Sequence, residues 1–137
     1  MEYYQKRKAV HAYYQKITKP VYTKYGLTDM EFSILMFLHY YPEINTASEL
    51  VKTASFSKSH VSMAVNNLVK NGYIETSFEN NNHKTVHLHL LEKADSVINE
   101  GHSANTMFIN KITEGISKEE IELFDSLLER MYANIKE

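Results

Sequence analysis

The order of three local patterns in the middle of the chain constrains the fold most strongly. Thr46 and Ser57 are hydroxyl residues of the kind that begin helices, and the second helix would end at Gly72, where a left-handed conformation costs little. Two strand-like segments follow, 73–78 and 84–90, with a polar turn between them. A helix, a second helix and a hairpin in this order predict a winged helix–turn–helix.

Capping patterns predict where three of the helices begin. Thr28, Thr46 and Ser117 are each followed three residues later by Glu. This is the capping box, in which the hydroxyl accepts from the third amide and the Glu side chain returns to the cap. The helices should therefore start near residues 29, 47 and 118. The first should end near Tyr41, and its residues 32–38 are apolar nearly all round, as in a helix enclosed by others.

The helix predicted from Ser57 to about Asn71 has two unlike faces. The apolar stripe, which should be buried, consists of Val61, Ala64, Val65 and Leu68. The opposite face is polar and short-chained, and consists of Ser59, Met63, Asn66 and Lys70, flanked by Ser62 and Asn67. Because it has few of the Glu/Lys pairs that are common on a merely solvated helix, this face is a candidate recognition surface.

Both ends of the chain are predicted to form further amphipathic helices, over residues 3–18, 91–114 and 118–136. The apolar residues of the last helix recur at steps of three and four, and are Ile121, Phe124, Leu127, Leu128, Met131 and Ile135. A small winged domain does not need three extra helices to fold. These apolar faces therefore predict a subunit interface formed by the termini, and packing within one chain is the alternative.

These patterns predict a mainly α-helical protein with a small β-hairpin and two functional parts. Residues 27–90 would be a winged helix–turn–helix DNA-binding domain, and residues 1–26 and 91–137 a helical dimerisation region. The length of 137 residues and the 43% hydrophobic content fit one globular unit. Neither a signal peptide nor an apolar run long enough for a membrane helix is present, so we expect a cytoplasmic protein without a membrane partner.

The net charge of −2 argues weakly against a nucleic-acid partner, but the charge is unevenly placed. Residues 1–26 hold six Lys or Arg and one acid, whereas residues 92–137 hold five Lys or Arg and ten acids. Residues 46–91 are nearly neutral and include four of the seven His. A locally positive face is compatible with this distribution.

The chain resembles the MarR family of bacterial transcriptional regulators in three stretches: GLTDMEFSILMFL, TASELVKTASFSKSHVSMAVNNLVKNGYIE and GISKEEIELFDSLLERM. The resemblance extends from about Leu27 to Met131, and its most specific part runs from Ser57 to Ile74. It implies a homodimer whose terminal helices form the interface. It also implies that the two winged domains bind a pseudo-palindromic site on double-stranded DNA, most simply as a repressor.

The candidate DNA contacts lie on the helix after Ser57 and on the wing. Asn can pair bidentately with adenine, Lys suits phosphate, and Ser62 matches a position where the family has Thr or Ser. The full set is Ser57 (as the N-cap), Lys58, Ser59, His60, Ser62, Met63, Asn66, Asn67, Lys70, His83 and Lys84. The alternative is a solvated polar face, which the absence of Arg from this helix favours.

The wing departs from the family pattern at three positions. The family commonly has an arginine at the position of Thr76 and an aspartate at Asn82, which brace the hairpin, and a groove-binding arginine at Lys84. Here the bracing pair is missing. Lysine is a point charge without the planar fork of arginine. The resemblance therefore predicts a more flexible wing that contributes less to affinity than is usual in the family.

Three histidines of the hairpin region suggest alternative roles. His83 lies in the predicted turn 79–83, and His87 and His89 would share the exposed face of the second strand. Neither a Cys nor a helical His pair at i and i+4 completes a metal site, so we expect no metal and no cofactor. Protonation of these side chains near DNA phosphates is a second hypothesis, and a plain exposed hairpin face is the third.

Tyrosines are frequent in the first part of the chain, and two histidines lie among them. They are Tyr13, Tyr14, Tyr22, Tyr25, Tyr40 and Tyr41, with His11 and His39. The family resemblance implies a crevice for a small aromatic effector between the dimer helices and the winged domain. Aromatic packing in a helical core is the simpler explanation.

The sequence also bears on two other classes of protein, enzymes and protein-binding adaptors. Catalysis is not expected, because the sequence has no nucleophile–base motif and no Gly-rich phosphate loop. A dimeric winged-helix adaptor or antagonist that binds proteins, with weak or no DNA binding, is the main alternative, since the wing lacks its usual arginine.

Overall fold

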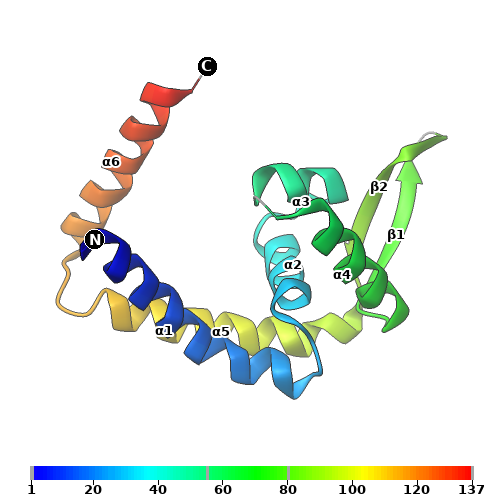
Figure 1. The fold of residues 1–137 in the computed structure, drawn as a ribbon, viewed down its shortest axis with the longest axis horizontal. Helices are drawn as coiled ribbons and strands as arrows, with labels where there is room; N and C mark the ends of the chain where they lie inside the picture. Colours follow the sequence, from blue (N-terminus) through cyan, green and yellow to red (C-terminus); the bar gives the residue numbers. More distant parts are fainter. Residues whose placement is uncertain (1, 55, 80, 137) are drawn as a thin grey trace.

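A computed structural model describes residues 2–54, 56–79 and 81–136 of the chain. The elements in order are α1 (Glu2–Lys24), α2 (Asp29–Tyr40), α3 (Ala47–Thr53), α4 (Lys58–Lys70), β1 (Ile74–Glu79), β2 (Asn82–Leu90), a short 3₁₀ turn η1 (Glu92–Ala94), α5 (Asp95–Ile112) and α6 (Lys118–Ile135). Figure 1 shows α2, α3, α4 and the hairpin as one unit, with α1 and α5 running side by side away from it. The predicted mainly α-helical winged helix–turn–helix fold is confirmed. None of the described helices is both long and apolar enough to cross a membrane.

The helix starts occur where the capping patterns predict them. At Thr46 and at Ser117 both hydrogen bonds of the capping box are present. At Thr28 the structure has the first of the two bonds, from the amide of Glu31 to the hydroxyl at 3.2 Å. The side chain of Glu31 is buried. The start of α2 is therefore an N-cap and not the complete box that we predicted.

Helix α1 is longer than predicted, because it continues beyond Thr18 and through Pro20 to Lys24. A proline inside a helix removes one hydrogen bond and costs about 3 kcal/mol. The residues after it offset this cost by tertiary packing. The buried ring of Tyr22 lies 5.5 Å from the ring of Phe32, and its hydroxyl donates to Gln15 Oε1 at 3.1 Å.

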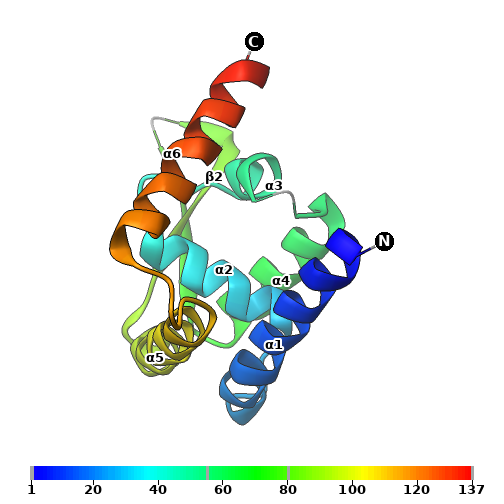
Figure 2. The same ribbon diagram turned by 90° about the vertical axis from the view of Figure 1, so that its left-hand side faces the viewer.

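Helix α2 lies in the middle of the core, as its nearly all-round apolar surface predicts. Figure 2 shows it between α5 on one side and α4 and α1 on the other, and β2 also contacts it. The largest fully buried side chains come from α2 and from the elements that enclose it, and include Phe32, Ile34, Leu35, Leu50, Val61, Leu68, Ile74 and Val97. This core therefore holds the winged unit and the start of α5 together.

The hairpin is antiparallel, with Ile74 opposite Leu90 and Glu79 opposite Asn82. The strands reach further toward the tip than predicted, so the turn is tighter than residues 79–83. Asn81 has φ = 60°, a left-handed conformation that Asn tolerates and that short hairpin turns require. Asn80, which also falls in the predicted turn, lies outside the described residues.

Helix α5 begins later than predicted, because residues 92–94 form η1 first. It crosses α2 very closely at Gly101. An added Cβ at Gly101 would lie 2.6 Å from Met36 Sδ and 2.8 Å from Phe32 Cε2. Glycine is therefore required here for the close approach of two helices.

A polar contact also joins α1 to α5. Lys24 Nζ lies 2.6 Å from Glu100 Oε1 and donates a hydrogen bond to it. This hydrogen bond is the main cause that holds the pKa of Glu100 below its ordinary value, and the neighbouring Tyr25 acts in the same direction. The ion pair therefore contributes stability while Glu100 is ionised.

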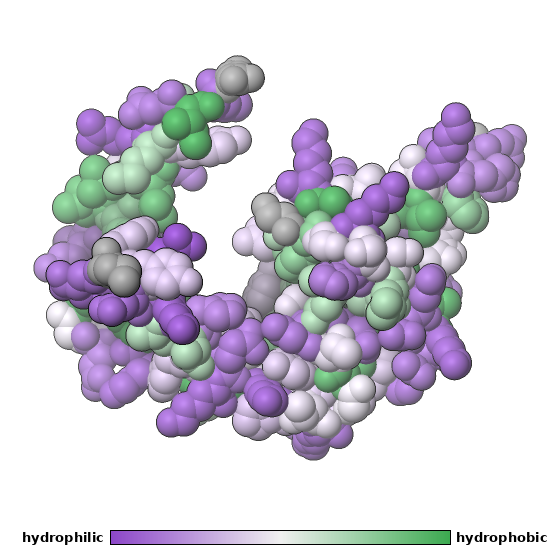
Figure 3. Space-filling model, in the orientation of Figure 1, coloured by the Kyte–Doolittle hydropathy of each residue, from purple (hydrophilic) through white to green (hydrophobic). Residues whose placement is uncertain are grey.

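Helix α6 matches its predicted range within one residue and has no buried residue. Its apolar side chains stand in the open, for example Phe124 at 60% and Met131 at 61% exposed. Figure 3 shows this hydrophobic surface at the end of the molecule opposite the hairpin. Within the part of the chain that the structure describes, α6 lacks the cover that an apolar face of this size requires.

We predict that Gly101→Ala destabilises the fold by about 1–3 kcal/mol, because the new methyl group overpacks Phe32 and Met36. In an ordinary helix the same change stabilises by up to about 1 kcal/mol. Urea denaturation measures the difference, with Ser103→Ala on the exposed side of α5 as the control. A stabilised Gly101→Ala variant would show that the close crossing of α2 and α5 is wrong.

We predict that Glu100→Gln lowers the free energy of unfolding at pH 7 and that the difference from wild type disappears in acid. A carboxylate whose folded pKa is lowered contributes fully above its unfolded pKa of about 4.5, and this contribution is lost as the pH falls through the folded value. Denaturation curves between pH 7 and pH 3 measure this, with the exposed Glu43→Gln as the control. A difference that is constant with pH contradicts the ion pair.

Candidate nucleic-acid interface

Helix α4 packs against the core with one face, and its opposite face is exposed. Ser57 is its N-cap and accepts from the amide of His60 at 3.5 Å, as predicted. The four residues of the predicted apolar stripe are all buried. Gly72 follows the helix with φ = 78°, which allows the chain to turn into β1.

All eleven predicted contact residues are exposed. Ser57, Lys58, Ser59 and His60 form the first turn of α4, and Asn67 and Lys70 lie in its last turns. Met63 is central on the uncovered face, where its side chain is 65% exposed. The face carries no acid and contains two lysines, so its charge suits an anionic partner.

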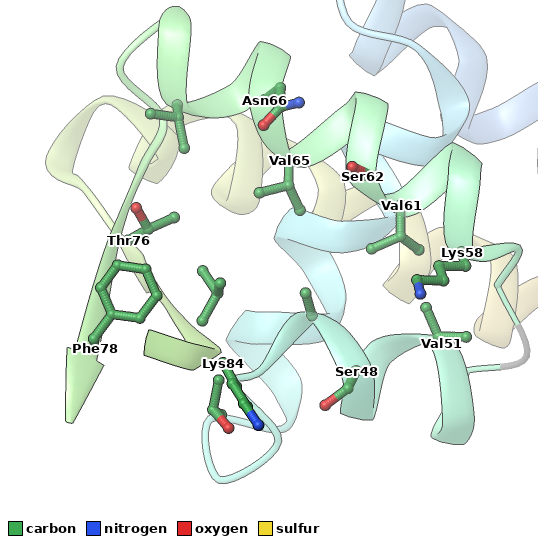
Figure 4. A pocket seen from close by; sticks show the side chains of 14 residues that line it. Ser48, Val51, Lys58, Val61, Ser62, Val65, Asn66, Thr76, Phe78 and Lys84 are labelled. Atoms are coloured by element: carbon green, nitrogen blue, oxygen red, sulfur yellow. The ribbon is translucent and has the colours of Figure 1, made fainter. Parts of the chain in front are cut away.

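A groove separates α4 and α3 from the hairpin, and four of the predicted residues line it. These are Lys58, Ser62 and Asn66 from α4 and Lys84 from β2 (Figure 4). The apolar lining is formed by Ala47, Val51, Val61, Val65, Val69, Phe78 and Val86. The predicted set therefore extends beyond the groove, over the rest of α4 and the tip of the wing. The seven predicted residues that do not line the groove are Ser57, Ser59, His60, Met63, Asn67, Lys70 and His83.

Sequence reasoning missed several residues of this groove, among them Ser48, Thr85 and the 48% exposed Phe78. Strand alternation does place Lys84 and Val86 on one side of β2. How the hairpin packs against α3 is a tertiary feature that has no local sequence signal.

The wing tip is braced by local contacts. Asn82 Oδ1 accepts from the amide of Lys84 at 3.0 Å, and Asn82 Nδ2 donates to Thr85 Oγ1 at 3.2 Å. The ring of His83 lies 5.1 Å from that of Phe78. Asn82, at the family's aspartate position, thus stabilises the turn through hydrogen bonds of its own.

The expectation that His87 and His89 lie on a plain exposed face is wrong. Both are half-buried, and the side chain of His87 is only 16% exposed. His87 Nδ1 lies 3.1 Å from Asn45 Oδ1, and His89 Nε2 lies 2.7 Å from Ser77 Oγ. Among the residues that the structure describes, no three His, Cys, Asp or Glu side chains form a group that could hold a metal ion.

The predicted aromatic region divides between helix packing and exposed positions. Tyr13 and Tyr14 pack against Phe108 of α5. Burial is the main cause that raises the pKa of the Tyr14 hydroxyl, and the negative charge of the nearby Asp29 adds to it. The hydroxyl of Tyr40 pairs with His102 Nδ1 at 2.9 Å and accepts from Asn105 Nδ2 at 3.2 Å. These contacts join α1 and α2 to α5, so packing accounts for these three tyrosines.

Comparison with known proteins gives one family match, to the MarR family over residues 25–84. This segment contains α2, α3, α4, β1 and the first residues of β2. A comparison with curated protein sequences gives no significant match.

Solved structures share the fold of nearly the whole chain. A putative MarR-family regulator from Listeria monocytogenes, in complex with a 26mer DNA, matches with a TM-score of 0.81 and 20% identity, over 96% of this chain and 87% of that one. MepR from S. aureus, also in complex with DNA, matches with a TM-score of 0.76 and 17% identity, over 99% and 97%. An organohalide-sensing transcriptional regulator bound to 2,4-dichlorophenol matches with a TM-score of 0.70 and 19% identity, over 98% and 77%.

Proposed function

With the resemblance to the MarR family confirmed, we propose that this chain is a DNA-binding transcriptional regulator that acts as a homodimer. The observation that carries the proposal is the uncovered polar face of α4, beside a wing that places Lys84 across a groove from Asn66. Two of the solved structures with this fold are complexes with DNA, which supports the same interpretation.

The middle of α4 carries the groups that read bases. Asn66 and Asn67 offer both a donor and an acceptor, which matches the edge of adenine in the major groove. Met63 is apolar and exposed between polar neighbours, and it suits the methyl group of thymine. These side chains would set sequence preference.

The lysines and helix starts at the edges of this surface would bind phosphates. Lys58 and Lys70 lie at opposite ends of α4, and Lys84 lies on the wing. Such contacts fix the position of the protein on the duplex without reading sequence.

The dimer would form through residues 1–26 and 91–137. The exposed apolar face of α6 needs a partner, because helices in proteins gain most of their stability by packing their apolar face against other elements. The N-terminal part of the chain is basic and the C-terminal part acidic, so α1 of one subunit and α6 of the other also attract each other. In this dimer the two α4 helices would lie about 34 Å apart, one turn of DNA, so that both enter the major groove on one side of the duplex.

A bound dimer would obstruct RNA polymerase, which makes repression the simplest mode of action. A small aromatic effector between the terminal helices and the winged domain would then release it. The solved structure with 2,4-dichlorophenol supports an aromatic ligand in a protein of this fold.

We predict that Asn66→Ala relaxes base preference and that Lys84→Ala weakens binding to all sequences. The first change removes about 1–3 kcal/mol of discrimination at one base pair. The second removes one phosphate contact and lowers the slope of log K against log salt by about one. Fluorescence titration with DNA from upstream of the chain's own gene, at two salt concentrations, measures both effects.

The matched control is Lys118→Ala, which removes an exposed lysine at the start of α6, away from the wing. Unchanged binding by both test variants would mean that α4 and the wing are not the interface. If the wild type shows no DNA binding at either salt concentration, the protein-binding adaptor becomes the better explanation.

We predict that Leu128→Asp converts the dimer to a monomer and abolishes binding to a two-half-site DNA. The new carboxylate would be buried without a partner in the interface, which costs several kcal/mol. Sedimentation velocity gives the mass, which for one chain is 16.0 kDa.

Ser126→Asp places the same charge on the opposite side of α6 and should leave the dimer intact. A wild type that sediments as a monomer, or a Leu128→Asp variant that stays dimeric, would contradict this interface.

A further inference from the structure

The base of the hairpin is fastened to the loop between α2 and α3. The amide of Leu88 donates to the carbonyl of Asn45 at 2.7 Å, and Thr46 and His87 form an antiparallel bridge. Thr46 is also the N-cap of α3, where its hydroxyl accepts from the amide of Glu49. The same short segment therefore ends the loop, begins α3 and holds β2.

The side chain of His87 adds a second link at this point. Its Nδ1 atom lies 3.1 Å from Asn45 Oδ1, and its Nε2 atom lies 3.7 Å from Glu79 Oε2. With only 16% of the side chain exposed, the imidazole is placed between the loop and the hairpin. The other titratable groups on this side of the hairpin are Glu75 and His89, which lie opposite each other.

The contact between His87 and Asn45 bears on the position of Lys84 in the wing. Lys84 precedes His87 by three positions on β2, and Ser48, two residues after the cap of α3, lines the same groove as Lys84. A change in the angle between β2 and this loop would move Lys84 relative to α4. The contact between His87 and Asn45 is therefore placed to fix the width of the groove.

We propose that His87 is a positioning residue for the wing: its imidazole, held by Asn45, keeps Lys84 at a fixed place relative to α4. The contact is a property of the folded chain alone, whereas its effect on DNA affinity rests on the proposed function. His89 offers the contrast, because it is a half-buried imidazole on the same strand that bonds to Ser77 within the hairpin.

Hydrogen exchange followed by NMR tests the positioning role without DNA. His87→Ala should speed exchange of the Leu88 amide and its neighbours on β2 roughly 5- to 15-fold, because the local opening loses one hydrogen bond. His87→Asn keeps a donor near the position of Nδ1 and should restore slow exchange. Asn45→Ala should match His87→Ala, and the double variant should add little to either. His89→Ala, the control, should leave the Leu88 amide unchanged.

The same variants in the salt titration test the consequence for DNA. His87→Ala should weaken binding and lower the salt slope as Lys84→Ala does, and in combination with Lys84→Ala it should add little. Circular dichroism confirms that each variant is folded.

Unchanged exchange in His87→Ala, or equal acceleration by His87→Asn and His87→Ala, would overturn the positioning role. So would normal affinity and salt slope in His87→Ala when Lys84→Ala lowers both. If the wild type binds no DNA, only the proposed function fails, and the exchange measurements still decide whether His87 fixes the hairpin.

Discussion

The enclosure of α2 by the other elements is the constraint on which the structure depends. Phe32 on this helix packs against Tyr22 of α1 and beneath Gly101 of α5. Ile34 and Leu35, from the same helix, are fully buried in the core that also contains α3, α4 and the hairpin. Because α2 contacts both the long helices α1 and α5 and the winged unit, these parts are packed as a single body. The uncovered face of α4 therefore has a fixed orientation relative to α1 and α5.

Local chemistry explains how much of the fold could be predicted. Thr28, Thr46, Ser57 and Ser117 mark the starts of four helices because a hydroxyl at that position satisfies a free amide within three residues. The residues that form such contacts are only three positions apart, so the pattern can be recognised in the sequence. The continuation of α1 through Pro20 is different, since it depends on packing against α2, and that partner cannot be identified from the residues near the proline.

The candidate site also has a part that local sequence predicts and a part that depends on tertiary packing. Periodicity alone identified the exposed face of α4, because Val61 and Leu68 define the opposite, buried side. It could not find the other walls of the groove, which are lined by Ser48 of α3 and Phe78 of β1. Nor could it show that His87 faces Asn45, a residue 42 positions away. Whether the exposed residues bind DNA depends on their contacts with another molecule, so DNA binding stays a prediction.

The close crossing of α5 over α2 at Gly101 has a mechanical consequence. Its 18 residues span about 27 Å at 1.5 Å per residue, and they run from the base of the hairpin to the loop that leads into α6. A tilt of about 5° at one end of a rod of this length displaces the other end by about 2 Å. With Gly101 as the point where it rests on α2, the helix acts as a lever. The two arms of this lever are unequal, with six residues (about 9 Å) toward the hairpin and eleven (about 17 Å) toward α6, so a movement at the α6 end would reach the hairpin at about half its size.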